Sequence, residues 1–438
     1  MNSEKKYRIP GYVLLFAACI LPLTLRLLFP DTYHHYDVHT FQQWGDFHDN
    51  MKDLYLTECY CNYPYLGMLL STGLIRLLGD AVFPFLVVLS FVDMLNILIL
   101  YRIFRKLGCS KPALWAGIIG LLPAVWVGGA LWGQIDTIGQ TFLLLLTVVI
   151  IQHLRSGEHK AIYFVLYGLL FSACILTKQL LLFPLAPIGV FLLTHLVQSA
   201  NWMNTLRLVT LGVLFFLLPI AIIDSYVSIP GNYAWSHLEK ILLEGSDHMD
   251  EISGNGFNIW MLFYDNMGAA STDTLIITSP KKLGLLMFVG LFLFVTIRQI
   301  QFLRSDSEWK DRLIVLLFFF VLINLGFNLF LTGTHERYLY HFYPFMGVLI
   351  FTGMNRHPSL FSKLDFGLLI FGGILYGAFV FGILQQYHHS KPLFRELIAH
   401  RILLVFYLLY FARLSWQYLR FTRKNDQLSQ NSIESCEK

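Results

Sequence analysis

Long apolar runs recur along the whole chain of 438 residues, and they constrain its fold more than any other feature. A membrane-spanning helix needs roughly 20 mostly apolar residues, and about twelve runs satisfy that length rule. The expected spans are 9–30, 82–104, 112–131, 135–153, 161–178, 180–198, 206–227, 281–301, 312–332, 338–354, 365–385 and 398–418. Only 14% of the residues are charged, whereas a soluble domain carries about 25%. The sequence therefore predicts an all-α polytopic membrane protein and excludes a single soluble globular domain.

The basic residues between the spans indicate how the chain is oriented. If the N-terminus lies in the cytoplasm, Arg102, Arg105 and Arg155 fall in cytoplasmic loops, as do most basic residues further along the chain. This distribution satisfies the positive-inside rule. The apolar run at 65–78 is expected to form an interfacial or re-entrant helix, because it carries Arg76 and because a span there would invert every later loop. Both termini are expected in the cytoplasm, and the plasma membrane is the expected location.

The chain shows no internal repeat and no Pro- or Gly-rich linker. We therefore expect one membrane domain at 1–425, followed by a polar cytoplasmic tail at 426–438. Two outer loops, 31–81 and 228–280, are longer than the others, and long ordered loops usually carry function. The absence of an Asn-x-Ser/Thr sequon favours a bacterial source. The net charge of +4 includes no long basic block, so nucleic acid is not an expected partner.

Two acidic residues open the first outer loop. Asp37 lies a few residues beyond the first span, and Asp46 follows Trp44. A carboxylate held just above the bilayer among aromatic side chains can accept a proton from an incoming hydroxyl group. The alternative is a solvated loop acid, since aspartate is common in loops.

A second polar turn, Trp132 to Asp136, joins two spans on the same outer side. Asp136 either caps the following helix, where an acid interacts favourably with the helix dipole, or faces the interior of the bundle. Lys178 stands near the outer end of its own span. Its ammonium group either snorkels to the interface or pairs with a buried anion.

The most informative polar cluster is His335-Glu336-Arg337, which is squeezed between two apolar runs. Arg337 offers a forked donor and His335 a switchable one, so the cluster can bind a phosphate group. In the alternative interpretation, Glu336 and Arg337 only neutralise each other. The loop around Asn258 and Trp260 combines glycines with an aromatic wall and could close over a sugar or lipid.

Asp93 and Asn96 lie midway along the second expected span, where polar groups are costly in hydrocarbon. Hydrogen bonding between helices explains them best. The other polar candidates all fall on the outer face, which suits the transfer of a group from a lipid phosphate to a hydroxyl group. The phosphate would be the leaving group, and cations would stabilise its developing charge.

Several of these residues occur in a characteristic order. The positions are Asp37 followed by Phe41 and Trp44, the Tyr63-Pro64 pair, Asp93 ahead of Tyr101-Arg102, the Trp132 to Asp136 turn, Lys178, Phe257 to Trp260, and His335 to Tyr338. In this order the chain resembles the GT-C superfamily of polytopic glycosyltransferases. It is especially similar to bacterial and archaeal relatives of the eukaryotic mannosyltransferase that adds the second mannose of phosphatidylinositol anchors.

The resemblance implies a GT-C-like bundle, a polyprenyl-phosphate-hexose donor and an inverting direct displacement. It further implies that Asp37 is the catalytic base and that His335 and Arg337 hold the donor phosphate, helped by Lys178. The side chains expected to contact the sugar or the acceptor are Trp44, Asp46, Trp132, Gln134, Asp136, Asn258, Trp260 and Glu336. No metal ion or other cofactor is expected, since the acids and histidines form no recognisable ligand motif.

The sequence thus predicts a hexosyltransferase of the mannosyltransferase type, acting on the outer face of the membrane. Its expected partners are a polyprenyl-phosphate-linked sugar donor, membrane lipid, and a glycan, lipid or protein acceptor. A membrane transporter or lipid-linked sugar flippase is the main alternative, and it predicts polar residues through the midplane and discontinuous paired helices. A polysaccharide polymerase or ligase would favour arginines in large outer loops, yet 228–280 contains no arginine.

Overall fold

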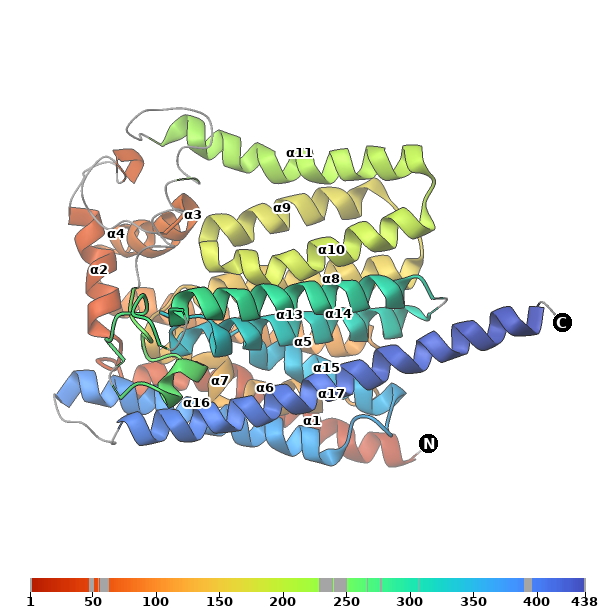
Figure 1. The fold of residues 1–438 in the computed structure, drawn as a ribbon. Coiled ribbons are helices and arrows are strands. Elements are labelled where there is room, and N and C mark those ends of the chain that lie inside the picture. The colour runs from red at the N-terminus through yellow and green to blue at the C-terminus, as the bar shows by residue number, and fades with distance from the viewer. Residues whose placement is uncertain are drawn as a thin grey trace. The chain divides into compact units, whose positions relative to one another are not determined.

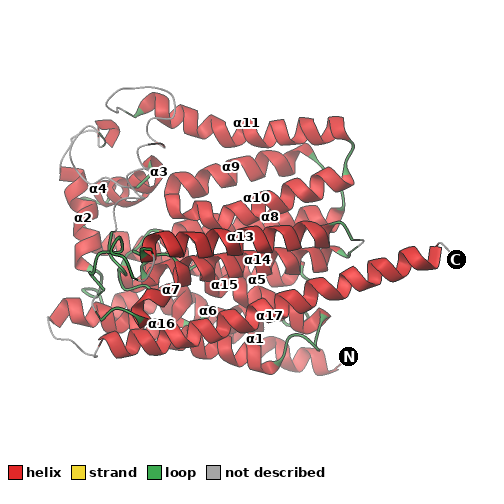
Figure 2. Ribbon diagram, in the orientation of Figure 1, coloured by secondary structure: helices red, strands yellow, loops and turns green. Residues whose placement is uncertain are grey.

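The structure, a computed structural model, is predominantly helical in the residues that it describes. Those residues are 2–46, 51–53, 55, 63–227, 239, 250–265, 267–275, 278–305, 307–389 and 396–436. Among them there is no β-strand, only isolated bridges at Glu251, Gly254 and Asn255, and Figure 2 shows helices joined by loops. The prediction of an all-α fold is therefore confirmed.

Nine helices within the described residues are long and apolar enough to cross a membrane. They are α1 (Asn2–Leu28), α5 (Val82–Lys106), α8 (Asp136–Ser156), α10 (Leu182–Ser199), α11 (Trp202–Tyr226), α13 (Pro280–Leu303), α14 (Trp309–Phe330), α16 (Lys363–His389) and α17 (Glu396–Cys436). Each agrees with one of the expected spans. The chain is a multi-pass membrane protein.

Three of the twelve expected spans differ from these long helices. The run 112–131 is not continuous: α6 (Pro112–Gly120) is bent by 79° from the segment Pro123–Trp132, which begins with α7 (Pro123–Trp126). Pro123 causes this break, because proline donates no hydrogen bond and forces the residue before it out of the helical conformation. The helices α9 (Ala161–Thr177) and α15 (Phe342–Arg356) are only 17 and 15 residues long.

The ambiguous run at 65–78 forms one short apolar helix. Its parts are α3 (Tyr65–Met68), the π-helical η2 (Leu69–Gly73) and α4 (Leu74–Leu77). It is too short to count among the nine long helices, in agreement with its exclusion from the expected spans.

The chain divides into two compact units. The first unit comprises residues 1–182, 206–248 and 377–393, and the second comprises 183–205, 249–376 and 394–438. Each unit is built from segments that are far apart in the sequence, because helices from different parts of the chain pack together.

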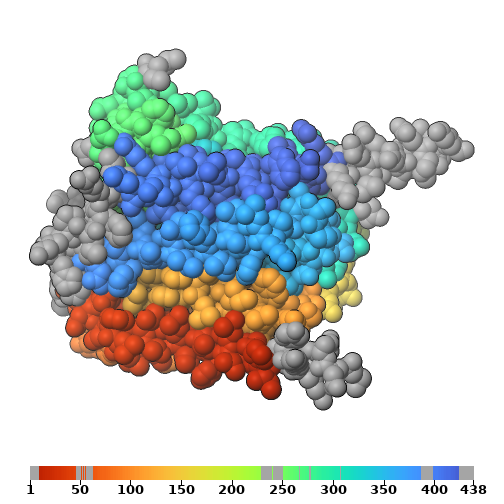
Figure 3. All heavy atoms as spheres, turned by 90° about the horizontal axis from the view of Figure 1, so that it is seen from below, coloured from red at the N-terminus to blue at the C-terminus, as the bar shows by residue number. Residues whose placement is uncertain are grey.

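In the first unit, α1 packs against α5 and α6, α5 against α8, and α8 against α9 (Figure 1). The space-filling view shows the red residues of α1 against the orange residues of α6 (Figure 3). Gly117 makes this close approach possible, since a Cβ atom there would lie 2.8 Å from the backbone of Leu14. Small residues commonly let membrane helices approach in this way.

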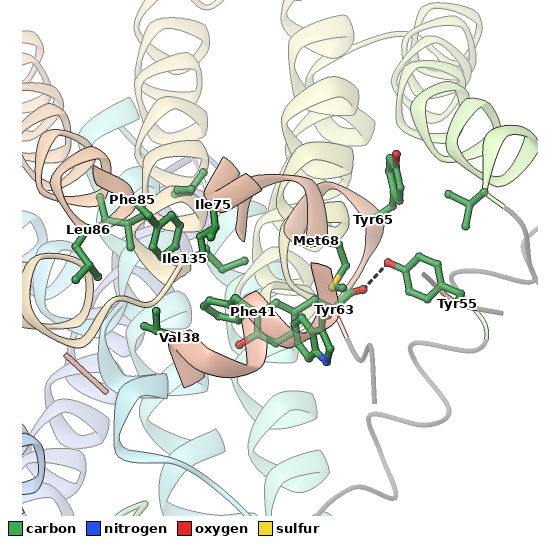
Figure 4. Close-up of a cluster of buried hydrophobic side chains, with 14 residues drawn as sticks. Val38, Phe41, Tyr55, Tyr63, Tyr65, Met68, Ile75, Phe85, Leu86 and Ile135 are labelled. Atoms are coloured by element: carbon green, nitrogen blue, oxygen red, sulfur yellow. Dashed lines mark hydrogen bonds between the residues drawn. The ribbon is translucent and has the colours of Figure 1, made fainter. Parts of the chain in front are cut away.

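A hydrophobic cluster holds the segment after α1 on the ends of the helices (Figure 4). Val38 and Phe41 of α2 (His35–Asp46) pack there with Phe85 and Leu86 of α5 and with Ile135, which precedes α8. The apolar face of α2 is thereby buried, and its N-terminal turn is held beside the Trp132 to Asp136 turn.

In the second unit, α14 is the central helix: it packs against α13, α15 and α17, and its apolar stretch is completely buried. Figure 1 shows α13 and α14 running side by side. Two short 3-10 helices, η5 (Ile259–Leu262) and η6 (Glu336–Leu339), lie near the C-terminal end of α14 and carry candidate site residues.

Candidate functional site

Asp37 is the third residue of α2 and lies in its first turn. The helix begins where the amide of Val38 donates to the carbonyl oxygen of His34 at 3.1 Å. The backbone of His34 is itself anchored, since its amide donates to the carbonyl oxygen of Trp132 at 3.0 Å. Asp37 is therefore placed by both its own helix and the turn that precedes α8.

The carboxylate of Asp37 is oriented by two donors from that turn. The indole Nε1 of Trp132 donates to Asp37 Oδ2 at 2.7 Å, and the amide Nε2 of Gln134 donates to the same oxygen at 2.5 Å. Only 13% of the Asp37 side chain is exposed. Asp37 of the first loop and the two residues of the Trp132 to Asp136 turn thus form one hydrogen-bonded group.

His34 completes the surroundings of Asp37. Its ring stacks on the indole of Trp132, with the centroids 4.4 Å apart and the planes 10° from parallel. The backbone amide of Asp37 lies 3.2 Å from His34 Nδ1. His34 Nδ1 also lies 3.2 Å from Asp37 Oδ2, so the imidazole lies directly beside the carboxylate.

Lys178 pairs with Asp136 in the same unit. The two charged atoms are 2.6 Å apart, and each side chain is only 4% exposed. The ammonium group also lies 5.4 Å from the ring centroid of Tyr63, whose hydroxyl donates to Gln134 Oε1 at 3.2 Å. Of the two alternatives for Lys178, pairing with a buried anion is confirmed, and the anion is Asp136.

The remaining candidates of the segment after α1, Trp44 and Asp46, have different surroundings. Trp44 is buried against Phe41 and Tyr63, with ring centroids 5.6 and 5.5 Å away. Its packing is clear, and contact with a sugar stays a prediction. Asp46 is the last residue of α2, and its side chain lies outside the described residues.

Asp93 and Asn96 join α5 to α8 through hydrogen bonds. Thr137 donates to Asp93 Oδ1, Asn96 donates to the Thr137 carbonyl oxygen at 2.9 Å, and Thr141 donates to Asn96 Oδ1 at 2.7 Å. The preference for interhelical hydrogen bonding over a transport role at these positions agrees with this network.

We predict that Gly129→Ala destabilises the first unit. Gly129 lies in the π-helical η3 (Val127–Trp132), and a Cβ atom there would lie 2.5 Å from Asp93 Oδ2. Both residues are buried, so the overpacking should lower the free energy of unfolding by about 1–3 kcal/mol. Thermal unfolding in detergent measures this change. Gly367→Ala serves as the control, because nothing lies within 4 Å of its Cβ position, and an equal loss in both variants would contradict the prediction.

In the second unit, the loop around Asn258 lies on the segment that carries the His335 to Arg337 cluster. The amides of Gly254 and Gly256 donate to the carbonyl oxygen of Thr334 at 3.0 and 2.8 Å. Asn258 Nδ2 donates to Thr334 Oγ1 at 3.3 Å, and Trp260 Nε1 donates to the carbonyl oxygen of Phe330 at 2.7 Å. Asn258 and Trp260, both buried, thus hold this loop against the end of α14.

The loop packs closely against His335 of the cluster, and His335 and Arg337 are partly buried. A Cβ atom on Gly254 would lie 2.7 Å from the His335 ring, so only glycine permits this approach. Glu336 is fully buried, and the Arg337 guanidinium lies 5.9 Å from the ring centroid of Tyr338. His335 also meets the Tyr338 ring edge-on at 5.3 Å. The cluster combines one cation, one buried acid and one imidazole beside aromatic rings.

The structure groups the candidates into two clusters. The Asp37 cluster contains His34, Asp37, Trp132 and Gln134, with the Asp136–Lys178 pair joined through Tyr63. The His335 cluster contains Asn258, Trp260, His335, Glu336 and Arg337. Sequence reasoning gave no site role to His34 or to Arg26. Arg26 could have been selected from the sequence by its charge inside an apolar run, because charged residues within membrane spans are usually functional.

Fold and clusters together define a polytopic helical membrane protein with polar groups gathered at helix ends. No protein-family model matches the chain, and no curated protein matches it either.

Proposed function

We propose that this protein is an inverting hexosyltransferase that uses a polyprenyl-phosphate-linked sugar and acts on the outer face of the membrane. The observation that carries the proposal is the arrangement at Asp37. A partly exposed carboxylate, fixed by Trp132 and Gln134 at the end of the membrane helices, suits a general base. The resemblance of the ordered motifs to GT-C glycosyltransferases supports the same reaction class.

In the proposed reaction, the acceptor hydroxyl oxygen attacks the anomeric carbon of the donor sugar. Asp37 accepts the hydroxyl proton while the bond between the anomeric carbon and the phosphate oxygen breaks. The electron pair of that bond leaves with the polyprenyl phosphate. Because the attack comes from the face opposite the phosphate, the anomeric configuration inverts. We propose mannose as the transferred hexose.

His335 and Arg337 are the proposed ligands of the donor phosphate. A guanidinium group binds phosphate oxygens through two parallel hydrogen bonds, and an imidazole adds a third donor. The buried ammonium of Lys178 already pairs with Asp136, so a phosphate would have to compete with that carboxylate for it. We therefore expect Lys178 to contribute less to donor binding than Arg337.

We predict that Arg337→Gln raises the KM for the donor by roughly 10- to 100-fold, which is the usual worth of a hydrogen bond to a charged group. Arg337→Lys should recover part of this loss, because it keeps the positive charge but not the two parallel N–H donors of the guanidinium group. Initial rates over a series of donor concentrations give both KM values. Arg420→Gln is the matched control, since its guanidinium stacks on Trp416 at 4.5 Å within α17. An unchanged donor KM in Arg337→Gln would contradict the phosphate assignment.

The proposal itself is tested by donor consumption. Membranes containing the protein are incubated with labelled polyprenyl-phosphate-mannose and, separately, with labelled polyprenyl-phosphate-glucose. Transfer of label to a water-soluble or larger product, absent from membranes without the protein, is the expected result for the mannose donor. If neither donor is consumed while the labelled lipid crosses the bilayer, the protein is a flippase and not a transferase.

A further inference from the structure

Arg26 is a buried cation that the proposed reaction does not use. It lies in the last turn of α1, and its side chain has no solvent exposure. Burying a guanidinium group is costly unless its donors are all satisfied. The partners of Arg26 therefore indicate what the residue is for.

All hydrogen bonds of the guanidinium group go to backbone carbonyl oxygens. Arg26 Nη1 donates to Phe29 at 2.9 Å and to Pro30 at 3.0 Å, and Nη2 donates to Thr32 at 2.7 Å. On the other side, Nε donates to Ala130 at 2.9 Å and Nη2 donates to Leu131 at 3.1 Å. The acceptors thus belong to two segments, one after α1 and one in the last turn of η3.

Both segments follow or form the C-terminal end of a helix. Carbonyl groups at such an end lack partners within the helix, and the helix dipole makes the end negative. One guanidinium group therefore caps two helices at once. The planar fork of arginine permits this double cap, whereas the compact ammonium of a lysine could not reach both segments.

The two capped segments lead directly to the Asp37 cluster. Thr32 precedes His34 by two residues, and Leu131 precedes Trp132. The next contact between the two segments is the hydrogen bond from the His34 amide to the Trp132 carbonyl oxygen. The bond from Trp132 Nε1 to Asp37 Oδ2 follows one helical turn later. Arg26 thus sets the register between the segment that carries the base and the segment that orients it.

We infer that Arg26 is a positioning residue for Asp37, acting through the His34 and Trp132 segments without touching substrate. This inference rests on the proposed function. The expected effect of Arg26→Lys is a kcat lower by about 10- to 100-fold, the usual cost of misplacing a reacting group. The KM for the donor should stay unchanged, because the proposed ligands of the donor phosphate are His335 and Arg337.

A cap that serves stability alone would reduce only the amount of folded protein, so kcat is expressed per mole of folded protein, and on that basis it would stay unchanged. Arg413→Lys is the control, because Arg413 also holds its surroundings together through several bonds, here to the side chains of Asp365 and Ser362 in the second unit. That variant should melt at a lower temperature with kcat unchanged. The pH dependence of kcat/KM should shift in Arg26→Lys and not in Arg413→Lys, because only the former alters the surroundings of the base.

A double-mutant cycle tests whether Arg26 influences Asp37 through Trp132. Trp132→Phe removes the indole donor to Asp37 while keeping an aromatic ring. If Arg26 acts through Trp132, the double variant Arg26→Lys/Trp132→Phe should lose no more activity than the worse single variant. Fully additive losses would overturn the inference.

Arg26→Gln, which keeps amide donors without the charge, covers the case in which Arg26→Lys does not fold. Failure of both variants to fold would make Arg26 a structural cap and overturn the inference.

If the wild-type protein transfers no sugar, the proposed function fails. Hydrogen exchange still tests whether Arg26 sets the register between the His34 and Trp132 segments. Faster exchange of the His34 and Asp37 amides in Arg26→Lys would support the role of Arg26 in joining the two segments. Unchanged exchange would overturn that role.

Discussion

Replacing Asp37 by asparagine is expected to lower kcat for sugar transfer by about 100- to 10,000-fold, the range that general base catalysis contributes. Asparagine has nearly the same shape, and its carbonyl oxygen can still accept from Trp132 and Gln134. Asparagine cannot, however, take up the proton of the acceptor's hydroxyl group. The KM for the donor should change little, because the loss falls on the transition state.

The measurement is transfer from the labelled donor by wild-type protein and by Asp37→Asn in the same membranes. Asp31→Asn is the control, since Asp31 is an exposed acid of the same segment, six residues before the proposed base. It should retain full transfer. Full transfer by Asp37→Asn would show that Asp37 is not the base, even if the reaction class is right.

The second large effect is expected at the pair formed by Asp136 and Lys178. Lys178→Met should lower the free energy of unfolding by about 3–5 kcal/mol, because it leaves a carboxylate buried without its cation. The two side chains are each only 4% exposed, so water cannot replace the lost partner. Thermal or denaturant unfolding of the purified protein in detergent measures the change.

The double variant Asp136→Asn/Lys178→Met separates the structural role of Lys178 from a role in donor binding. Removing both charges should restore most of the lost stability, since replacing a whole buried pair is often nearly neutral. If Lys178 also binds the donor phosphate, the double variant should be stable but show a raised KM for the donor. A single variant Lys178→Met as stable as the wild type would contradict the assigned importance of the pair.

The positions of most helices followed from composition alone. Twenty apolar residues in a row must cross a bilayer as a helix, because only a helix satisfies every backbone group within one segment. The run 112–131 shows the limit of this rule. Its length and hydropathy are those of a span, but Pro123 breaks it with a bend of 79°, and hydropathy does not record backbone hydrogen bonds.

The partners of polar residues were less predictable than the residues themselves. Asp37, Trp132, Gln134, Asp136 and Lys178 could be selected from the sequence because polar groups are scarce beside apolar runs. Which of them meet was not predictable, since they are separated by up to 141 positions (37 to 178) and their contacts depend on how α2, α8 and α9 pack. Lys178 illustrates the point. Its sequence position fits both an ammonium group that snorkels to the interface and one that pairs with a buried anion, and only the fold brings that group within 2.6 Å of Asp136.

The sequence by itself determined that this protein is a helical, multi-pass membrane protein, where its apolar segments lie, and which few polar residues require an explanation. Those properties depend on local composition and on the bilayer. Only the tertiary structure decided that Arg26 caps two helix ends, that Trp132 and Gln134 orient Asp37, and that Asn258 holds a loop on Thr334. Such contacts join atoms that are distant in sequence, and their energies depend on distance and burial, which the order of residues does not specify.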